Sequence, residues 1–336
     1  MTKTSPTAVS DSIFQTVLAA TSDAFSSDTA VITAARLAQM HVAKFHIVHA
    51  VPLVSFLGKT EHFAFSPNPT SGQAEIYSQS AIHSLMALYA NHFPNLTPND
   101  LCIAAGVPWE AVFRTAQDAG SDLIVVGPHA ATVETRDLAG EKNFMGGTAD
   151  GVIRLADCPV MIVSNAINIE ALAFKNVIVG MDFSPSCAAA VCMAAVVAHY
   201  TQAFITTFHM LPIAPYPKYS PQAIQAERIR LQKRMNTVCQ DLLGGIGHQY
   251  FVKPGARPFD ELLRFAHHIK ADLIIMGSHV KEKRGKWYSG SVVQQVACQA
   301  GCPVIVVKGP EALSPWKKRP AVAGCFSKMA AYTTHF

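Results

Sequence analysis

The chain has 336 residues, of which 50% are hydrophobic and 15% are charged, so it is long enough for two ordinary α/β domains with substantial cores. Its formal net charge of +4 is too small to indicate a nucleic-acid-binding protein. A membrane span needs roughly 18 consecutive apolar residues, and the longest apolar run, CAAAVCMAAVVA at 187–198, ends well short of that at His199.

The polar start of the chain, MTKTSPTAVSDS, has neither the basic residues nor the apolar run of a signal peptide, so a cytoplasmic location is expected. The eight cysteines include no C-x-x-C pair, and Cys187, Cys192 and Cys298 fall at apolar helix positions. We therefore expect reduced thiols in the core of a cytosolic protein, rather than disulfides or zinc ligands.

An internal repeat organises the chain. Residues 17–51 align without a gap on residues 177–211, and later blocks recur in the same order. These blocks are SDLIVVGPH at 121 with ADLIIMGSH at 271, and CPVMIV at 158 with CPVIVV at 302. The repeat predicts a duplicated domain, with one copy at 1–167, a second at 172–310 and a C-terminal tail at 311–336.

Secondary structure is easiest to read in the second copy. Short apolar runs alternate there with longer helical patterns, which is typical of β-α units around a parallel sheet. Strands are predicted at 176–181, 203–208, 249–253, 271–276 and 303–308. They are rich in Val, Ile and Phe, as strands buried on both faces should be. The helix after the first strand begins with a Ser-Pro start signal, SPSCAAAV.

The loop GSHVKEKRGKWYSGS, residues 277–291, connects the fourth strand of this copy to its last helix. Its spacing matches neither Walker A nor the Rossmann fingerprint. Gly277 is followed after two residues by Val280, and nine residues later by Gly290 and Ser291.

Together these features resemble the universal stress protein family in its tandem two-domain form, over roughly 14–165 and 174–309. In the nucleotide-binding branch of that family the last loop reads G-x-x-G, nine residues, then G-[ST]. The loop at 277–291 reproduces this spacing, with Val280 in place of the second glycine. The family's other nucleotide contact is an Asp after the first strand, and Asp182 stands there.

The resemblance implies an α/β fold of two tandem Rossmann-like (HUP, or adenine nucleotide alpha hydrolase-like) domains. Each would be a five-stranded parallel sheet of order 3-2-1-4-5 flanked by helices. The last strands, CPVMIVSN and CPVIVVKG, are too apolar to be exposed. We expect them to pair antiparallel around a pseudo-twofold axis, so that one chain imitates the family's dimer.

The resemblance also implies that ATP, or AMP or ADP in its place, binds the second domain, with Mg²⁺ carried by the nucleotide. The expected site residues are Gly180, Asp182, Met210, Met276, Gly277, His279, Gly290, Ser291 and Val292. Asp182 would accept a hydrogen bond from a ribose hydroxyl or an adenine amino group. The helix start at Gly290 and Ser291 would offer N–H groups and a positive dipole end to phosphate. The cationic segment KEKRGK is either a phosphate clamp or a solvated loop.

Two features of the sequence argue against nucleotide binding, one in each domain. Val280 is β-branched and tolerates a positive φ poorly, so a second interpretation is a degenerate loop that only keeps its packing. In the first domain Ser22 replaces Asp182, and Pro128 removes the N–H that Ser278 would offer. Gly146 retains a helix-start position there, but a structural role is expected for that domain's site.

The histidines are interpreted individually. His49 and His209 each end an apolar strand without a triad partner, so both are expected either to pack in the core or to support a site residue without touching a ligand. For His279 and its twin His129, ligand contact and simple loop packing both stay open.

The sequence thus predicts a cytoplasmic stress-response protein that binds an adenine nucleotide in its second domain and acts as a sensor or scaffold. The alternatives are a slow ATPase or nucleotidyl-transfer enzyme, and a ligand-free interaction module with decayed sites. No catalytic or metal-binding residue is predicted, and weak ATP hydrolysis is the most activity expected. Neither a nucleic-acid nor a membrane partner is expected, and a homodimer through other surfaces stays open.

Overall fold

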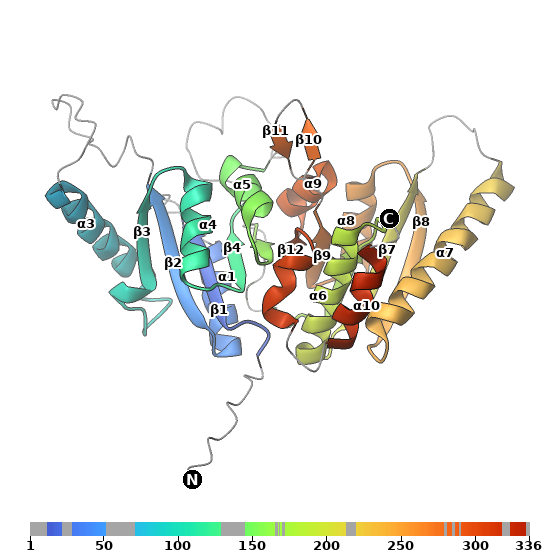
Figure 1. The fold of residues 1–336 in the computed structure, drawn as a ribbon, viewed down its shortest axis with the longest axis horizontal. Coiled ribbons are helices and arrows are strands. Elements are labelled where there is room, and N and C mark those ends of the chain that lie inside the picture. Colours follow the sequence, from blue (N-terminus) through green and yellow to red (C-terminus); the bar gives the residue numbers. More distant parts are fainter. Residues whose placement is uncertain are drawn as a thin grey trace, which may run out of the picture.

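The structure is a computed structural model that describes residues 12–21, 29–51, 71–128, 145–164, 167, 169, 172–212, 220–278, 281–283, 286–288, 290–317 and 323–333. Figure 1 shows the described helices packed against a central sheet, with the two halves of the chain side by side.

The first half of the chain contributes five strands. The strands are β1 (Thr16–Thr21), β2 (Lys44–Val51), β3 (Leu101–Ala105), β4 (Leu123–Val126) and β5 (Val160–Ile162). The helices described with them are α1 (Thr29–His41), α3 (Ser71–Tyr89), the 3-10 helix η1 (Pro98–Asp100), α4 (Pro108–Asp118) and α5 (Gly147–Leu155).

The second half repeats this succession. Its strands in the large sheet are β6 (Asn176–Gly180), β7 (Phe204–Pro212), β8 (His248–Gly255), β9 (Leu273–Gly277) and β12 (Val304–Val307). A hairpin of β10 (Lys281–Lys283) and β11 (Lys286–Tyr288) follows β9. The helices are α6 (Pro185–Thr201), α7 (Pro221–Leu243), α8 (Pro258–His268), α9 (Ser291–Gln299), the 3-10 helix η4 (Pro310–Trp316) and α10 (Ala323–Thr333).

Among the described residues, the strands outside the hairpin form one ten-stranded sheet of order β3-β2-β1-β4-β5-β12-β9-β6-β7-β8. Within each half the pairing is parallel and the order is 3-2-1-4-5. The α/β fold expected from the sequence is therefore confirmed, and the five strands predicted for the second copy all occur.

The two halves join through their last strands. β12 pairs antiparallel with β5, and the partners are Val304 with Ile162, Ile305 with Met161 and Val306 with Val160. Three further hydrogen bonds cross the junction, from Gln294 Nε2 to Asp150 Oδ1, from Ser164 Oγ to the Ala300 carbonyl and from Lys308 Nζ to the Leu155 carbonyl. The predicted pseudo-twofold pairing is thus confirmed, and α5 and α9 lie next to each other at the centre of Figure 1.

The sheet separates two apolar layers, and each layer continues across both halves. On one face the strands pack with α1, α3, α6, α7 and α10, and on the other with α4, α5, α8 and α9. Alternate strand residues point to opposite layers, as in any pleated strand. Met161 belongs to the first layer, and its neighbours Val160 and Ile162 belong to the second.

A repeated aspartate fixes the start of each half's first strand. Asp122 accepts hydrogen bonds from the backbone N–H groups of Gln15 and Thr16, and Asp272 accepts them from Lys175 and Asn176. This explains the recurrence of Asp in the two DLI segments without any ligand, because the carboxylates lie at the amino ends of the strands.

Helix α6 is apolar on every side, and all of its residues from Ser186 to Ala198 are buried. Ser184 caps it by accepting a hydrogen bond from the Cys187 N–H at 3.1 Å, as its Ser-Pro start predicts. A helix that is hydrophobic all round must be covered on all sides. None of the described helices is both long and apolar enough to cross a membrane.

The C-terminal residues supply the cover for α6. Ala312, Leu313 and Trp316 are fully buried, and the indole N–H of Trp316 donates to the carbonyl of Ile13 at 2.9 Å. Helix α10 packs against α6 and α7, with Phe326 and other apolar residues in the core. The segment that the sequence marks as a tail is, in its described part, an integral layer of the second half.

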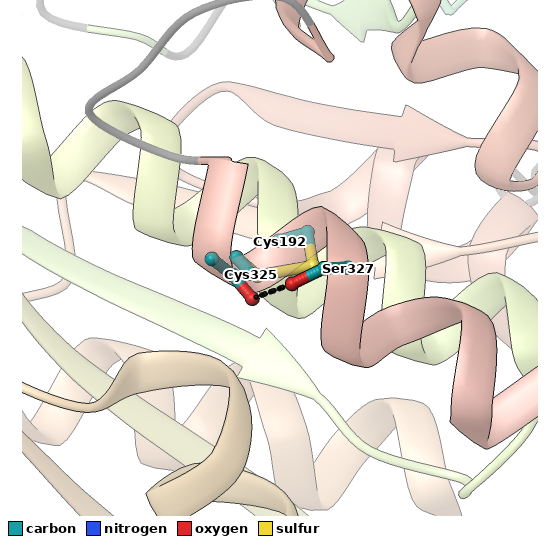
Figure 2. The surroundings of a disulfide bond; sticks show 4 residues. Cys192, Cys325 and Ser327 are labelled. Carbon is teal, nitrogen blue, oxygen red and sulfur yellow. Dashed lines mark hydrogen bonds between the residues drawn. A yellow bond between two sulfur atoms is a disulfide. The ribbon is translucent and has the colours of Figure 1, made fainter.

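A disulfide joins Cys192 of α6 to Cys325 of α10, as Figure 2 shows. The expectation of reduced cysteines throughout is therefore wrong at this pair. The two residues are 133 positions apart, and Cys325 lies in a segment with no counterpart in the repeat, so nothing in the sequence pattern indicated that they meet. Cys187 and Cys298 remain free thiols, as predicted.

We expect Cys325→Ser to lower the free energy of unfolding by about 2 kcal/mol, because it removes a cross-link that restricts the unfolded chain. Urea unfolding of the oxidised protein measures this loss, and hydrogen exchange should show faster exchange in α10. Cys298→Ser is the matched control, since Cys298 is a partly buried free thiol. Equal stability of the two variants would contradict a structural role for the disulfide.

Candidate functional site

A cavity of about 260 Å³ opens at the carboxyl ends of β6, β7 and β9, beside the first turns of α8 and α9. Its lining residues are Gly180, Met181, Asp182, Phe208, His209, Met210, Pro258, Leu262, Met276, Gly277, Gly290, Ser291, Val292 and Val293. β6 and β9 are neighbours in the sheet, and the strand order reverses between them. Open α/β sheets bind ligands at such reversals.

Eight of the nine site residues expected from the sequence line this cavity. They are Gly180, Asp182, Met210, Met276, Gly277, Gly290, Ser291 and Val292. The ninth, His279, lies outside the described residues. So does Val280, which stands in place of the second glycine of the loop pattern.

Sequence reasoning missed six of the lining residues. They are Met181, Phe208, His209, Pro258, Leu262 and Val293. Pro258 and Leu262 belong to the start of α8, which leaves the same edge of the sheet as the Gly-Ser start of α9. The motif RPFDELL was a usable signal, because a helix that follows a parallel strand begins at the carboxyl edge of the sheet.

Asp182 lies in the turn after β6 and is exposed at the edge of the cavity. Its Oδ1 accepts hydrogen bonds from the Ser184 N–H at 3.0 Å and the Ser184 hydroxyl at 2.6 Å. Ser184 in turn caps α6, so the carboxylate is held by the helix start. This arrangement keeps a fixed negative charge at the cavity.

The residue after Asp182 has an uncommon backbone. Phe183 has φ of 65°, which is unfavourable for a bulky side chain, yet it is buried. The Arg234 guanidinium of α7 lies 4.2 Å from the centre of the Phe183 ring, a cation–π contact. The Phe183 ring also contacts the His209 ring, at a centroid distance of 4.9 Å. The turn after β6 is thus fixed by packing from two other elements.

His209 sits on β7 and is among the residues that line the cavity, where the sequence predicted either a packed histidine or one that supports a site residue. Its Nδ1 lies 2.7 Å from the carbonyl oxygen of Met181. Burial lowers the pKa of His209 below its ordinary value, so the ring is predominantly neutral at pH 7. The other strand-end histidine, His49, is buried in the first half.

The start of α9 offers backbone donors to the cavity. Gly290 is the N-cap residue, and its end of the helix has no side-chain cap. The first N–H groups of a helix have no partner within it, and the helix dipole adds positive potential there. Ser291 and Val292 therefore provide a suitable place for an anionic group.

Gly277 has a packing role that the sequence did not reveal. A Cβ on this residue would lie 2.4 Å from the Ser186 carbonyl carbon and 2.5 Å from the Cys187 nitrogen. The end of β9 is pressed against the first turn of α6, and glycine is required for that contact. Gly290 differs, because a Cβ there meets no atom within 4 Å.

The corresponding part of the first half is described only in part. Gly146 is the N-cap of α5, again without a side-chain cap, and its N–H donates to the Pro128 carbonyl at 2.7 Å. Ser22 and His129 lie outside the described residues. A structural role for this region remains a prediction.

Comparison with known proteins finds similarity along most of the chain. The sequence model described as the universal stress protein family matches residues 14–164 and 173–308. A universal stress protein of Thermus aquaticus is 29% identical over 140 residues, which cover 40% of this chain and 99% of that protein. One from Methanocaldococcus jannaschii is 44% identical over 54 residues, which cover 16% of this chain and 32% of that protein's length.

A solved structure is similar over nearly the full chain. It is a universal stress protein from Archaeoglobus fulgidus, with a TM-score of 0.57 and 18% identity, and the similarity covers 89% of this chain and 97% of that one. At this identity the comparison shows a common fold.

Proposed function

The chain belongs to the universal stress protein family, and on this premise we propose that its second domain binds ATP or a related adenine nucleotide in the cavity between β6 and β9. The observation that carries this proposal is the convergence of a carboxylate, Asp182, and an uncapped helix start, Ser291, on one largely apolar cavity.

The residues present fit the parts of a nucleotide. Apolar side chains of Met210, Met276 and Leu262 line the cavity and suit a nucleobase. Asp182 suits a hydrogen-bond donor such as a ribose hydroxyl. The N–H groups at the start of α9 suit phosphate oxygens, with Mg²⁺ carried by the nucleotide. The cavity volume of about 260 Å³ is small, which supports enclosure of the base and sugar with the phosphates outside.

The lining supports binding rather than efficient catalysis. Of the fourteen lining residues, Asp182 and His209 are the ionisable ones, and His209 donates to a backbone carbonyl. We accordingly propose a sensor or scaffold of the cytoplasmic stress response. The cytoplasm keeps most thiols reduced. In such a compartment the Cys192–Cys325 disulfide would form only when conditions become oxidising.

Titration calorimetry with ATP and Mg²⁺ tests the proposal, and one site per chain is expected. Asp182→Ala should weaken binding by about 1.5 to 3 kcal/mol, because the ligand loses a charged acceptor. Asp118→Ala is the matched control, since Asp118 is an exposed carboxylate at the end of α4. Two equivalent sites, or equal affinities of the two variants, would contradict the assignment.

A further inference from the structure

The turn after β6 contributes residues to both sides of the sheet. Asp182 lines the cavity, which lies beside the first turns of α8 and α9. Phe183 belongs to the apolar layer that packs with α6 and α7, and its side chain is buried there. One planar peptide unit joins the two residues, so their positions are not independent. A contact that fixes Phe183 therefore also acts on the carboxylate at the cavity.

Both ends of this turn are anchored. The Met181 N–H donates to the carbonyl of Phe208 on β7 at 2.8 Å. At the other end Ser184 caps α6, and it also donates to the carboxylate of Asp182. Between these anchors the backbone conformation of Asp182 and Phe183 decides where the carboxylate lies.

The backbone of Phe183 needs support from its surroundings. Its φ of 65° lies in the left-handed region, which is unfavourable for a bulky side chain and persists only where neighbouring groups enforce it. Two groups contact its ring, the His209 ring at a centroid distance of 4.9 Å and the Arg234 guanidinium at 4.2 Å. His209 belongs to the adjacent strand, whereas Arg234 reaches the turn from a separate helix, α7.

We propose that Arg234 is a positioning residue for the nucleotide site. Its guanidinium holds the Phe183 ring and thereby keeps the left-handed turn that places the Asp182 carboxylate at the cavity. This inference rests on the proposed nucleotide site and extends it to α7, which contributes none of the described lining residues. Arg234 is exposed, so its replacement leaves the apolar core of the second half in place.

Titration calorimetry with ATP and Mg²⁺ measures the effect of removing the cation. Arg234→Met keeps an unbranched apolar side chain but loses the attraction to the ring, so ATP affinity should fall about threefold, the size expected for an exposed cation–π contact. Arg230→Met is the matched control, because it removes the same charge from the same helix at a residue paired with Glu227. It should leave the affinity unchanged. A role in stability alone would lower urea resistance without changing the affinity of the folded protein.

A change at Phe183 distinguishes positioning from direct contact of Arg234 with the ligand. Asn adopts the left-handed backbone more readily than Phe and offers no ring to the guanidinium. In a Phe183→Asn background, Arg234→Met should therefore cause no further loss of ATP affinity. Phe183→Gly, which adopts a positive φ freely and adds no polar group, should give the same result. A loss that persists in either background would overturn the proposal, because Arg234 would then act on the nucleotide or on Asp182 itself.

Hydrogen exchange of the ligand-free protein tests the turn without any nucleotide. The Ser184 N–H donates to Asp182 Oδ1 at 3.0 Å, and Arg234→Met should speed its exchange about threefold, because the turn opens more often. The control is the Asn176 N–H, which donates to Asp272 Oδ1 at the other end of β6 and should be unaffected. Unchanged exchange at Ser184 would show that Arg234 does not hold the turn.

The outcomes distinguish the two proposals. If the wild type binds no ATP, the nucleotide site itself is wrong, and the exchange at Ser184 still decides whether Arg234 holds the turn. If the wild type and Arg234→Met bind ATP equally, the nucleotide site stands and the positioning role of Arg234 is overturned.

Discussion

An Ile162→Asp, Val306→Asp double variant is expected to lose at least about 4 kcal/mol of unfolding free energy, because it places two unpaired charges in the junction of the two halves. Ile162 is fully buried and Val306 is 1% exposed. Both side chains face the apolar layer under α4, α5, α8 and α9, which is continuous across the junction.

The position of the charges makes the loss specific to the junction. Ile162 pairs with Val304, and Val306 pairs with Val160, so the two aspartates flank the central pair of Met161 and Ile305. Each lies in the strand that joins its half to the other. The halves should separate before either unfolds, since each keeps its other four strands.

Urea unfolding, binding of an apolar dye and limited proteolysis between residues 164 and 172 measure these effects. The double variant should bind more dye and be cleaved faster than the wild type. Phe251→Asp is the control, because Phe251 lies on the edge strand β8 and is 39% exposed. A double variant as stable as this control would show that the pairing of β5 with β12 does not hold the halves together.

The second large effect is expected at Gly277. Gly277→Ala should cost about 3 kcal/mol or more without any nucleotide present, because the added methyl group overlaps backbone atoms of Ser186 and Cys187. The N-terminus of α6 would have to move away from β9, and backbone yields less readily than a flexible side chain.

Gly290→Ala provides the comparison, since it changes the other motif glycine in open space. It should cost no more than about 1 kcal/mol, the usual difference between N-cap residues. Thermal unfolding of both ligand-free variants measures the contrast. Equal small losses would mean that Gly277 serves the ligand and not the packing against α6.

The fold was largely predictable because the repeat supplies the same evidence twice. The apolar strand segments of the first copy recur in the second in the same order. The edge strands CPVMIV and CPVIVV each needed a pairing strand, and each copy provides it for the other. The role of Asp122 and Asp272 was not predicted, because a carboxylate next to a strand has the same appearance whether it binds a ligand or backbone.

The C-terminal layer was not predictable for a different reason. Residues 310–333 occur once, so no second copy indicates what they contact. The all-round apolar character of CAAAVCMAAVVA did indicate that α6 is covered, but not by which segment.

The site was partly predictable. The loop spacing and Asp182 identified the residues contributed by β6, β9 and α9. His209 was not among the predicted site residues, because its sequence context, the end of an apolar strand, indicated only a packed histidine or one that supports a site residue. The turn that places Asp182 at the cavity contains Phe183 with φ of 65°, and a left-handed Phe has no sequence signature.

A crystal structure of the chain grown with ATP and Mg²⁺ tests the central claim most directly. The account predicts one nucleotide per chain in the second domain, with its sugar near Asp182 and its phosphates at the start of α9. Nucleotide at the start of α5, or elsewhere on the chain with the cavity between β6 and β9 empty, would contradict it.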